Sequence, residues 1–453
     1  MYSTGVSRWQ WSYKARQFVS AAILYTGWMQ SDNKSGLKSL TDRRGYALFM
    51  LVVVYTFNFI DRQIVGILAV PIKADLGLSD TQLGLMGGLA FALFYTGLGI
   101  PVAMMADRFN RTWIMTIALT VWSGMTAACG LATNFWQLFA ARLGVGVGEA
   151  GGVAPAYSLI SDFFPPTHRA RALSIYSFGI PIGSATGIVF GGVIASLLDW
   201  RIAFFIVGLA GIAIAPIFKA TVKEPTRGGF DRQRKNVTPP NLMAILRLLI
   251  KKPSFWLVSV GASCSSMMGY GLFFWLPSFF VRSFEMTLLS ASLHFGAVLL
   301  IGGIAGIWAG GWFGDRFGQM KFSWYVNIPA LAFIAAVPFY VLAMLSSSQA
   351  LTFVVLLFPT ALGLLWLGPV ISVIQHLVPP NMRATASAIF LFINNLIGIG
   401  IGTFLIGAMS DALQLQFGDD SLRYSILAGT GFYVLAAALF FLASRWLERD
   451  WER

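Results

Sequence analysis

The segments Ala106–Arg111 (ADRFNR) and Gly314–Gly318 (GDRFG) decide the fold, because the second nearly repeats the first almost half a chain later. Another pair follows in the same order, Pro165–Ala172 (PPTHRARA) and Pro379–Ala386 (PPNMRATA). Each segment is a short charged break between long apolar runs. Two copies in the same order predict two membrane bundles of similar build, which face each other across an interface where a solute can lie.

The composition is that of an integral membrane protein. Hydrophobic residues make up 57% and charged residues 11%, against about 25% charged in an ordinary soluble domain. The net charge of +13 lies mainly in loops and tails, so we expect no nucleic-acid partner. Cys129 and Cys264 lie inside apolar runs and the histidines lack ligand spacing, so no disulfide, metal or cofactor is expected. The sequence has no phosphate-binding Gly-Lys-Ser/Thr loop, which argues against an ATP-driven pump.

Twelve apolar runs are long enough to cross a bilayer, which takes about 20 residues each. We expect an all-α membrane protein with twelve transmembrane helices in two pseudo-symmetric six-helix bundles. The first bundle, 46–222, has spans at 46–70, 82–106, 112–134, 136–160, 170–198 and 202–222. The second bundle, 254–446, has spans at 254–281, 288–314, 321–345, 349–375, 384–410 and 424–446. The remaining segments are an N-terminal tail (1–45), a basic linker (223–253) and a C-terminal tail (447–453).

The distribution of Lys and Arg predicts the orientation. Most of them fall in the tails, the linker and the loops on one side of the spans, and that side is expected to be cytoplasmic. We therefore expect a protein of the cell (inner) membrane with both termini and the linker in the cytoplasm. The tail 1–45 is expected to be a cytoplasmic, disordered or interfacial segment, with an amphipathic anchor as the alternative. The loops on the other side carry Lys73, Arg201, Arg282 and Arg423.

Four ionisable residues lie well inside the predicted spans: Asp61, Arg62, Arg142 and Glu149. Each costs about 2.5–3.5 kcal/mol at the centre of a membrane helix, so each is a functional candidate. At 1.5 Å per residue, Asp61 lies roughly 13 Å, Arg142 roughly 9 Å and Glu149 roughly 20 Å below the outer surface. Arg142 and Glu149, two turns apart, share one helix face.

These heights suggest a column of two acids and one permanent cation. An arginine stays charged and binds carboxylate or phosphate with two parallel donors, whereas a carboxyl group away from water can take up a proton. We expect Asp61 and Glu149 to couple proton movement and Arg142 to exchange between them and an anionic ligand. The alternative is a static pair that holds two spans together. Arg62 could face the cavity and the substrate, pair elsewhere, or reach the membrane surface.

The second half has no Asp, Glu, Lys or Arg inside its spans and is rich in aromatic residues. A charged wall opposite an aromatic wall suits an amphipathic solute with an ionic head. Contact with lipid or core packing is the alternative for any single ring. The expected substrate contacts in this half are Tyr270, Phe273, Phe274, Trp275, Asn394 and Asn395.

Charged residues also gather at the predicted cytoplasmic ends of the spans. We expect them to act as gating residues that hold the halves together when the protein opens outward; fixing topology and loop structure is the alternative. They are Asp107, Arg108, Asp162, Arg169, Asp315, Arg316 and Arg383.

The segment Gly311–Gly318 resembles the loop signature of the Major Facilitator Superfamily, and the resemblance extends from about 46 to 446. The earlier copy departs from it, with Ala103 and Asn110 where the signature has glycines. The resemblance implies that fold, and a charge relay that joins Asp107 and Arg108 to Asp162 and the start of span 384–410.

Within the superfamily, Asn58–Arg62 (NFIDR), Gly146–Ala150 (GVGEA) and Leu173–Ser184 (LSIYSFGIPIGS) are similar to Spinster-type transporters. That resemblance implies export of lysophospholipids or phosphorylated sphingoid bases. It also implies that Asp61, Arg142 and Glu149 occupy coupling and head-group positions.

The expected function is therefore proton-coupled secondary active transport of an amphipathic anion, lysolipid-like or sphingoid-phosphate-like, by alternating access in a monomer surrounded by membrane lipids. An organic-anion or sugar-acid proton symporter is the alternative. A channel or receptor is disfavoured by the duplicated gating loops, and an enzyme by the lack of a visible nucleophile–base pair.

Overall fold

The computed structural model describes residues 35–165, 172–173, 175–227, 242–318, 320–379 and 382–452, without the side chains of 35–43, 107, 315, 383 and 384. Within these ranges all regular secondary structure is helical. Residues 50–453 form one compact unit, whose packing is described below. The preceding segment contributes the first turns of α2, which begins at Ser35 rather than near the predicted position 46. The rest of the predicted tail lies outside the described residues.

The chain order of the helices follows the predicted two halves, with α12 in the predicted linker. The first half contains α2 (Ser35–Ile67), α3 (Ala69–Leu76), α4 (Asp80–Gly84), the π-helical η1 (Leu85–Leu89), α5 (Ala90–Arg108), α6 (Arg111–Cys129), α7 (Phe135–Glu149), α8 (Val153–Phe163), α10 (Gly179–Leu197) and α11 (Trp200–Thr221). The linker and second half contain α12 (Leu242–Ile250), α13 (Pro253–Phe284), α14 (Leu288–Gly318), α15 (Trp324–Leu345), α16 (Gln349–Leu364), α17 (Leu367–His376), α18 (Arg383–Phe417), the 3-10 helix η3 (Gly418–Asp420), α19 (Ser421–Gly429) and α20 (Gly431–Asp450).

Ten helical stretches in the described ranges are long and apolar enough to cross a membrane. The last of them, Thr385–Asp450, contains α18, α19 and α20 and therefore two of the predicted spans. The predicted span 136–160 is divided between α7 and α8, of 15 and 11 residues, so neither part is long enough by itself. The all-α membrane fold is confirmed, and its helices are consistent with the twelve predicted spans.

Polar caps determine where several of these helices begin. Asn110 accepts a hydrogen bond from the main-chain N–H of Trp113 (2.9 Å), and Asn134 accepts one from Gln137 (3.0 Å). At α4, Ser79 and Gln82 form a reciprocal capping box. A side-chain oxygen on the residue directly before a helix accepts a hydrogen bond from a main-chain N–H that has no partner within the first turn. The caps thereby fix the register of α6 and of α7, and α7 carries Arg142 and Glu149.

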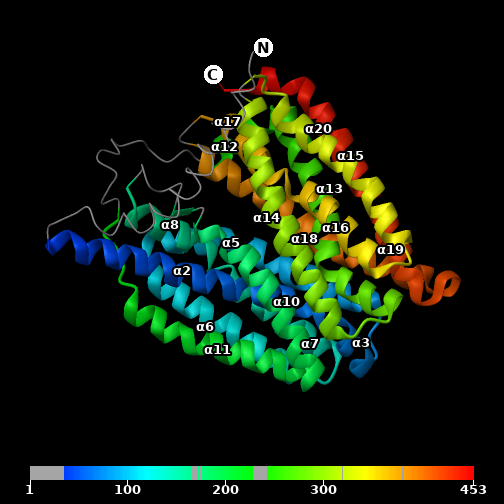
Figure 1. The fold of residues 1–453 in the computed structure, drawn as a ribbon. Helices are drawn as coiled ribbons and strands as arrows, with labels where there is room; N and C mark the ends of the chain where they lie inside the picture. The colour runs from blue at the N-terminus through cyan, green and yellow to red at the C-terminus, as the bar shows by residue number, and fades with distance from the viewer. Residues whose placement is uncertain are drawn as a thin grey trace, which may run out of the picture. The chain divides into compact units, whose positions relative to one another are not determined.

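Within each half the helices pack as neighbours that lie side by side in Figure 1. In the first half α6 contacts α7 and α11, and in the second half α13 contacts α18 and α20. The approach of α7 to α6 depends on Gly148, since a Cβ atom there would lie 2.5 Å from the main-chain nitrogen of Trp122. This close contact places the neighbouring Glu149 against α6.

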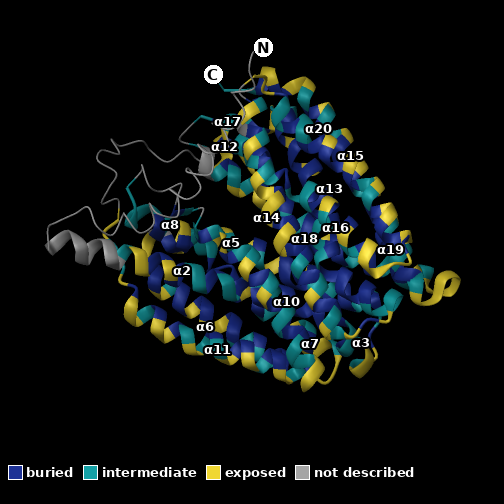
Figure 2. Cartoon of the chain, in the orientation of Figure 1, coloured by how far each residue is buried: buried dark blue, intermediate teal, exposed yellow. Residues whose placement is uncertain are grey.

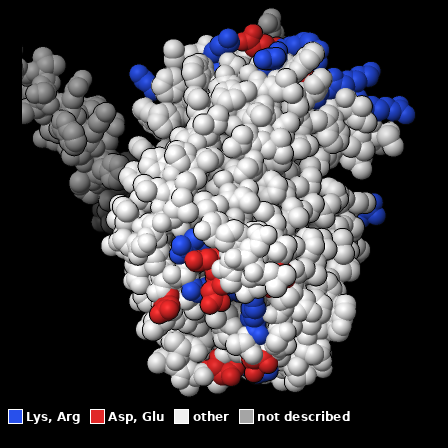
Figure 3. All heavy atoms as spheres, turned by 90° about the vertical axis from the view of Figure 1, so that its right-hand side faces the viewer, with Lys and Arg blue, Asp and Glu red and all other residues white. Residues whose placement is uncertain are grey.

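The outer surface of this unit is largely apolar. Large side chains such as Ile117, Leu209 and Trp308 are exposed, and Figure 2 shows exposed residues along the outward sides of α6 and α11. On the face drawn in Figure 3, charged side chains gather at the top and in the lower part, with a broad uncharged surface between them. An exposed apolar surface of this extent requires lipid, so the chain is a multi-pass membrane protein.

Two seams join the halves within this unit. One seam packs α10 against α14, and the other packs α18 against α4, η1 and α5. Both depend on glycine: a Cβ at Gly192 would lie 2.4 Å from Ser292, and one at Gly84 would lie 2.5 Å from the carbonyl oxygen of Thr403. Backbones that approach this closely are typical of membrane helix interfaces rich in small residues.

The helix that carries Glu149 is interrupted directly after it. α7 ends at Glu149 and α8 begins at Val153. Between them, the N–H of Gly151 donates to the carbonyl of Gly148, and that of Gly152 donates to the carbonyl of Glu149, each at 3.0 Å. These tight turns replace the regular α-helical pattern, so the span changes its winding beside the carboxylate.

Candidate functional site

An ion pair between α2 and α7 forms the charged centre of the first half. The Nε of Arg62 donates to Oε2 of Glu149 over 2.8 Å. The side chains of Arg62 and Glu149 are 12% and 0% exposed. Water therefore screens the pair little, and removal of either partner would leave the other as an almost unsolvated charge.

Arg142 lies near this ion pair but is not a member of it. Its Nη1 donates to the main-chain carbonyl of Asp61 over 3.3 Å, and its guanidinium lies 5.7 Å from the ring centre of Phe91. In this conformation the guanidinium bound to Glu149 is thus that of Arg62. Heights along the membrane normal placed Arg142 close to Asp61 and on the helix face of Glu149. Successive helical residues point about 100° apart, and this rotation aims Arg62 at α7.

The carboxylate of Asp61 is buried without a direct counter-charge. Asp61 is 1% exposed, and neither of its carboxylate oxygens has a hydrogen-bond partner among the described residues. Its electrostatic neighbours are Glu149, Thr126, Arg142 and Trp122. A proton on this group would remove a buried charge, whose cost in an apolar environment is high.

Further polar atoms around these side chains are also buried and unpaired within the described part of the chain. They include both amide atoms of Asn58, Oγ1 of Thr126, Nε of Arg142 and Oε1 of Glu149. Buried polar atoms in proteins ordinarily have partners. The cluster therefore has spare donors and acceptors with which to bind water or the polar group of a ligand.

Aromatic rings enclose the guanidinium of Arg62. The ring centres of Phe59, Phe91 and Tyr95 lie 5.0, 4.8 and 4.4 Å from its central carbon. Rings at this distance attract a cation through their faces. Tyr270, on α13 of the second half, is also an electrostatic neighbour of Arg62, so the structure brings one of the expected second-half contacts to the charged centre.

Other expected substrate contacts pack within the second half or against the first half. Trp275 is fully buried, and its indole N–H donates to the carbonyl of Thr403 over 2.9 Å. Phe274 is 5% exposed, and its ring fills the space beside Gly87 of η1. Oδ1 of Asn394 accepts a hydrogen bond from Ser266 over 2.9 Å, and Asn395 is half-buried.

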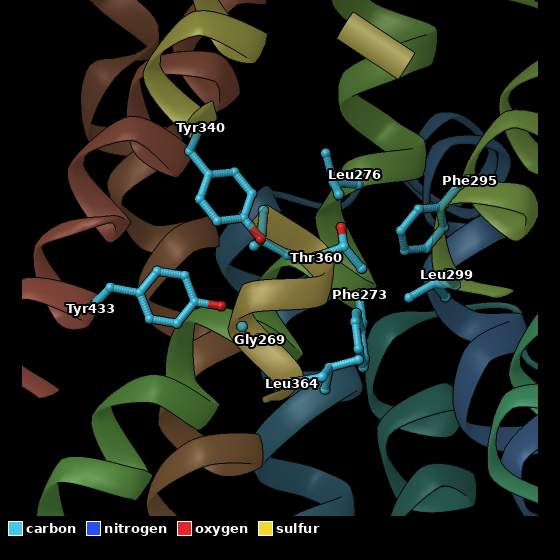
Figure 4. Close-up of a pocket in the computed structure, with 11 residues that line it drawn as sticks. Gly269, Phe273, Leu276, Phe295, Leu299, Tyr340, Thr360, Leu364 and Tyr433 are labelled. Atoms are coloured by element: carbon cyan, nitrogen blue, oxygen red, sulfur yellow. The ribbon is translucent and has the colours of Figure 1, made fainter. Parts of the chain in front are cut away.

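Phe273 lines a pocket inside the second half, drawn in Figure 4. The lining is mainly aliphatic and aromatic, with the hydroxyl groups of Tyr340, Thr360 and Tyr433 as its polar part. In Figure 4 the hydroxyls of Tyr340 and Tyr433 point toward the same side, near Thr360 and Gly269. The pocket shows that α13 presents an apolar, hollowed surface on the side of Phe273.

One member of the expected gating set, Asp162, is bound by a residue that sequence reasoning missed. Arg111, 1% exposed, binds Asp162 (2.5 Å) and Glu224 (2.6 Å), so it ties the start of α6 to α8 and to the segment after α11. Arg108 and Arg316 are exposed. Arg169 and the side chains of Asp107, Asp315 and Arg383 lie outside the described residues. Arg111 ends the first copy of the repeated segment, but the second copy has Gln319 there, so the repeat gave no signal for its role.

A second missed cluster lies at the opposite end of the bundles, around the fully buried Asp80. Its carboxylate accepts hydrogen bonds from Lys73, Ser410 and both terminal nitrogens of Arg282. In sequence, Asp80 looks like an ordinary first-turn acid after the Ser79 cap. Its partners from the second half are too far along the chain for a single sequence to reveal.

The family model for the Major Facilitator Superfamily matches residues 51–403. A curated relative, the MFS-type efflux pump of Mycolicibacterium smegmatis (strain ATCC 700084 / mc(2)155), is 32% identical, with 90% of this chain and 94% of the relative covered. Protein spinster homolog 1 of Homo sapiens is 27% identical, with 93% of this chain and 85% of the relative covered.

Among solved structures, a bacterial homolog of the human lysosomal transporter Spinster, inward-facing and unoccupied, is 32% identical and superposes with a TM-score of 0.83. The alignment covers 91% of this chain and 99% of that one. A structure of a bacterial Spinster homolog in an inward-facing, occupied conformation superposes with a TM-score of 0.80, and the alignment covers 90% of this chain and 98% of that one. With the helical membrane fold and the duplicated halves, these matches lead to one conclusion: the chain belongs to the Major Facilitator Superfamily and is a transporter of the Spinster type, not an enzyme.

Proposed function

We propose that this transporter couples an amphipathic anion to protons, with Asp61 and Glu149 as the proton-binding groups and Arg62 and Arg142 as the groups that bind the anionic head. The observation that carries the proposal is the Arg62–Glu149 pair, buried beside a second acid that has no direct counter-ion. Intramembrane charges of this kind are retained at substrate and proton sites.

The coupling follows from charge balance. Fully ionised, the two arginines and two acids sum to zero. An anion that binds a guanidinium competes with Glu149 for Arg62, and the released carboxylate would then be an unpaired buried charge. Uptake of one proton by that carboxylate restores neutrality. The anion and a proton therefore occupy the site together, and each favours the binding of the other.

The substrate class follows from what surrounds the charges. Arg62 lies among the rings of Phe59, Phe91 and Tyr95, and α13 contributes Tyr270 and the apolar surface at Phe273. An anionic head at Arg62 and Arg142 with an apolar chain along α13 describes a lysolipid or a phosphorylated sphingoid base.

The proposed orientation places both termini in the cytoplasm and the Asp80 cluster at the outer end. In this orientation the contacts between the halves around Asp80 close the outer side. The resemblance to a solved inward-facing structure supports the same reading of the conformation. Opening of the Asp80 end would give access to the other side of the membrane, as alternating access requires.

Transport by purified protein in liposomes tests the proposal. A radiolabelled lysophosphatidic acid is supplied with and without a pH gradient, and unlabelled glucuronate is added as a competitor. We expect the gradient to accelerate lysolipid movement in the wild type, and Glu149→Gln to abolish the acceleration. The matched control is Glu448→Gln, because that acid is 59% exposed and its contact with Lys321 is long, at 3.9 Å.

Each contrary outcome removes a defined part of the proposal. Equal acceleration in Glu149→Gln and Glu448→Gln would exclude coupling through Glu149. No movement of the lysolipid, together with gradient-driven uptake of radiolabelled glucuronate, would favour the organic-acid symporter instead.

A further inference from the structure

The polar side chains around Asp61 have more unpartnered oxygen atoms than one proton can satisfy. Both carboxylate oxygens of Asp61, Oδ1 of Asn58 and Oγ1 of Thr126 are buried without a hydrogen-bond partner among the described residues. Asp61, Asn58 and Thr126 are 1%, 2% and 0% exposed, so bulk water does not reach them. A proton on Asp61 supplies a single donor, which leaves the other oxygen atoms without a positive partner.

These oxygen atoms come from two helices that meet at Asp61. Asn58 and Asp61 are three residues apart on α2, so their side chains lie on the same helix face. Thr126 lies on α6 and, with Trp122 one turn before it, is a polar neighbour of the Asp61 carboxylate. Asn58 is a polar neighbour of Glu149, which in turn neighbours Asp61. A carboxylate, an amide and a hydroxyl group therefore gather in one buried place.

The two buried arginines of the site leave this carboxylate free. Arg62 binds Glu149 through Nε. Arg142 donates to the main-chain carbonyl of Asp61 and not to its carboxylate. The carboxylate of Asp61 thus keeps both of its oxygen atoms for another cation.

The chemistry of the oxygen atoms indicates which cation fits. Carboxylate, amide and hydroxyl oxygens suit hard cations, whereas transition metals favour imidazole and thiolate. The described part of the chain contains no group of three or more His, Cys, Asp or Glu side chains that could hold a metal ion. One acid without a direct counter-charge matches a monovalent ion, because a divalent ion would add two positive charges beside two arginines. Secondary transporters hold Na⁺ on oxygen atoms near the middle of the membrane.

We propose that Asn58, Asp61 and Thr126 bind a sodium ion, which takes the place of a proton on Asp61. Asp61 supplies the negative charge, and the amide and hydroxyl oxygens replace part of the water shell of the ion. The inference rests on the proposed function only in that Asp61 belongs to the coupling site. The spacing of His and Cys in the sequence gives no sign of the site, because none of its ligands is a His or a Cys.

Binding of radioactive Na⁺ to the purified full-length protein tests the site without any substrate. The protein is held in lipid nanodiscs at one fixed pH and constant ionic strength, and choline replaces Na⁺ in the reference buffer. Choline provides the same screening of charges but is too large to be bound among these oxygen atoms. Thermal unfolding is measured in both buffers, because an ion that binds only the folded state raises its stability.

In the wild type we expect saturable Na⁺ binding and an unfolding temperature that rises with Na⁺ but not with choline. Asp61→Asn is expected to abolish both effects. Thr126→Val keeps the shape of the side chain but removes the hydroxyl group, and we expect the affinity for Na⁺ to fall about ten-fold or more, as for other groups that support a metal site.

The matched control on the same helix is Thr116→Val. Thr116 is also buried, but its hydroxyl already donates to the carbonyl of Thr112 over 2.7 Å. We therefore expect the affinity for Na⁺ to stay unchanged in this control. Thr126→Ser, which keeps the hydroxyl group, is expected to retain most of the affinity. A cooperative unfolding transition in choline shows that each variant is folded.

Equal unfolding temperatures in Na⁺ and choline, without saturable binding to the wild type, would overturn the sodium site even if a variant failed to fold. Equal affinity for Na⁺ in Thr126→Val and the wild type would overturn the assignment of the ligands. Both results leave proton-driven transport through Glu149 untouched, because that transport is measured separately, in choline buffer. Conversely, a failed transport assay would leave the binding of Na⁺ standing.

Discussion

Replacement of Arg62 by methionine tests whether the buried ion pair is an energetic unit. Methionine keeps a side chain of comparable length among the rings of Phe59, Phe91 and Tyr95, but it leaves Oε2 of Glu149 without its donor. Glu149 is 0% exposed, so solvent cannot replace the lost partner. Removal of one member of such a pair costs about 3–5 kcal/mol, and we expect Arg62→Met to lower the free energy of unfolding by an amount in that range.

The companion variant Glu149→Gln in the Arg62→Met background removes the stranded charge. Neither side chain is then ionic. We expect the double variant to regain about 2 kcal/mol or more of the lost free energy of unfolding, because replacing both members of a buried pair by neutral residues costs far less than removing one member. The assay is reversible unfolding in mixed micelles at pH 8, analysed as a double-mutant cycle. Additive changes in the free energy of unfolding would refute the reasoning, because the effects of substitutions at independent residues add and those at paired residues do not.

The remaining predictions concern the two ends of the fold. Arg111→Met removes the buried base that Asp162 and Glu224 share, so we expect the free energy of unfolding to fall by about 3 kcal/mol in the same assay. Arg108→Met, at an exposed site, is the control and should change the free energy of unfolding by less than about 0.5 kcal/mol. Gly306→Ala places a Cβ 2.1 Å from the carbonyl oxygen of Ala361, and we expect it to lower stability by about 1–3 kcal/mol through overcrowding. An unchanged unfolding midpoint in Gly306→Ala would mean that α14 and α16 can separate freely.

The fold could be predicted because its signals are local and periodic. Long apolar runs are visible residue by residue, and the repeated loop at Asp107 and Asp315 divides the chain into two halves. The same locality identified Asp61, Arg142 and Glu149 as buried charges, since each interrupts an apolar run. Their burial, at 0–1% exposure, follows directly from that pattern.

The pairing of those charges could not be predicted from the same pattern. A height along the membrane is obtained by counting residues, but the direction of a side chain depends on the rotation of its helix against its neighbours. Arg62 rather than Arg142 therefore binds Glu149. The contact between Asp80 and Arg282 joins the segment after the first span of one half to the end of the first span of the other, and a single sequence does not reveal that contact. The burial of Trp275 could not be predicted for the same reason, because its indole N–H binds a carbonyl group of the distant helix α18.

The interruption after Glu149 has a mechanical consequence. A continuous helix would transmit any tilt at its Asp162 end directly to the carboxylate, because a rigid helix turns as a whole. Here the regular winding stops at Glu149 and resumes at Val153, so α7 and α8 are joined by a short non-helical segment that can act as a hinge. The Asp162 end of α8 can follow Arg111 and the surrounding loops as that side of the protein moves. A change in the tilt of α8 therefore does not by itself require that Glu149 lose its contact with Arg62.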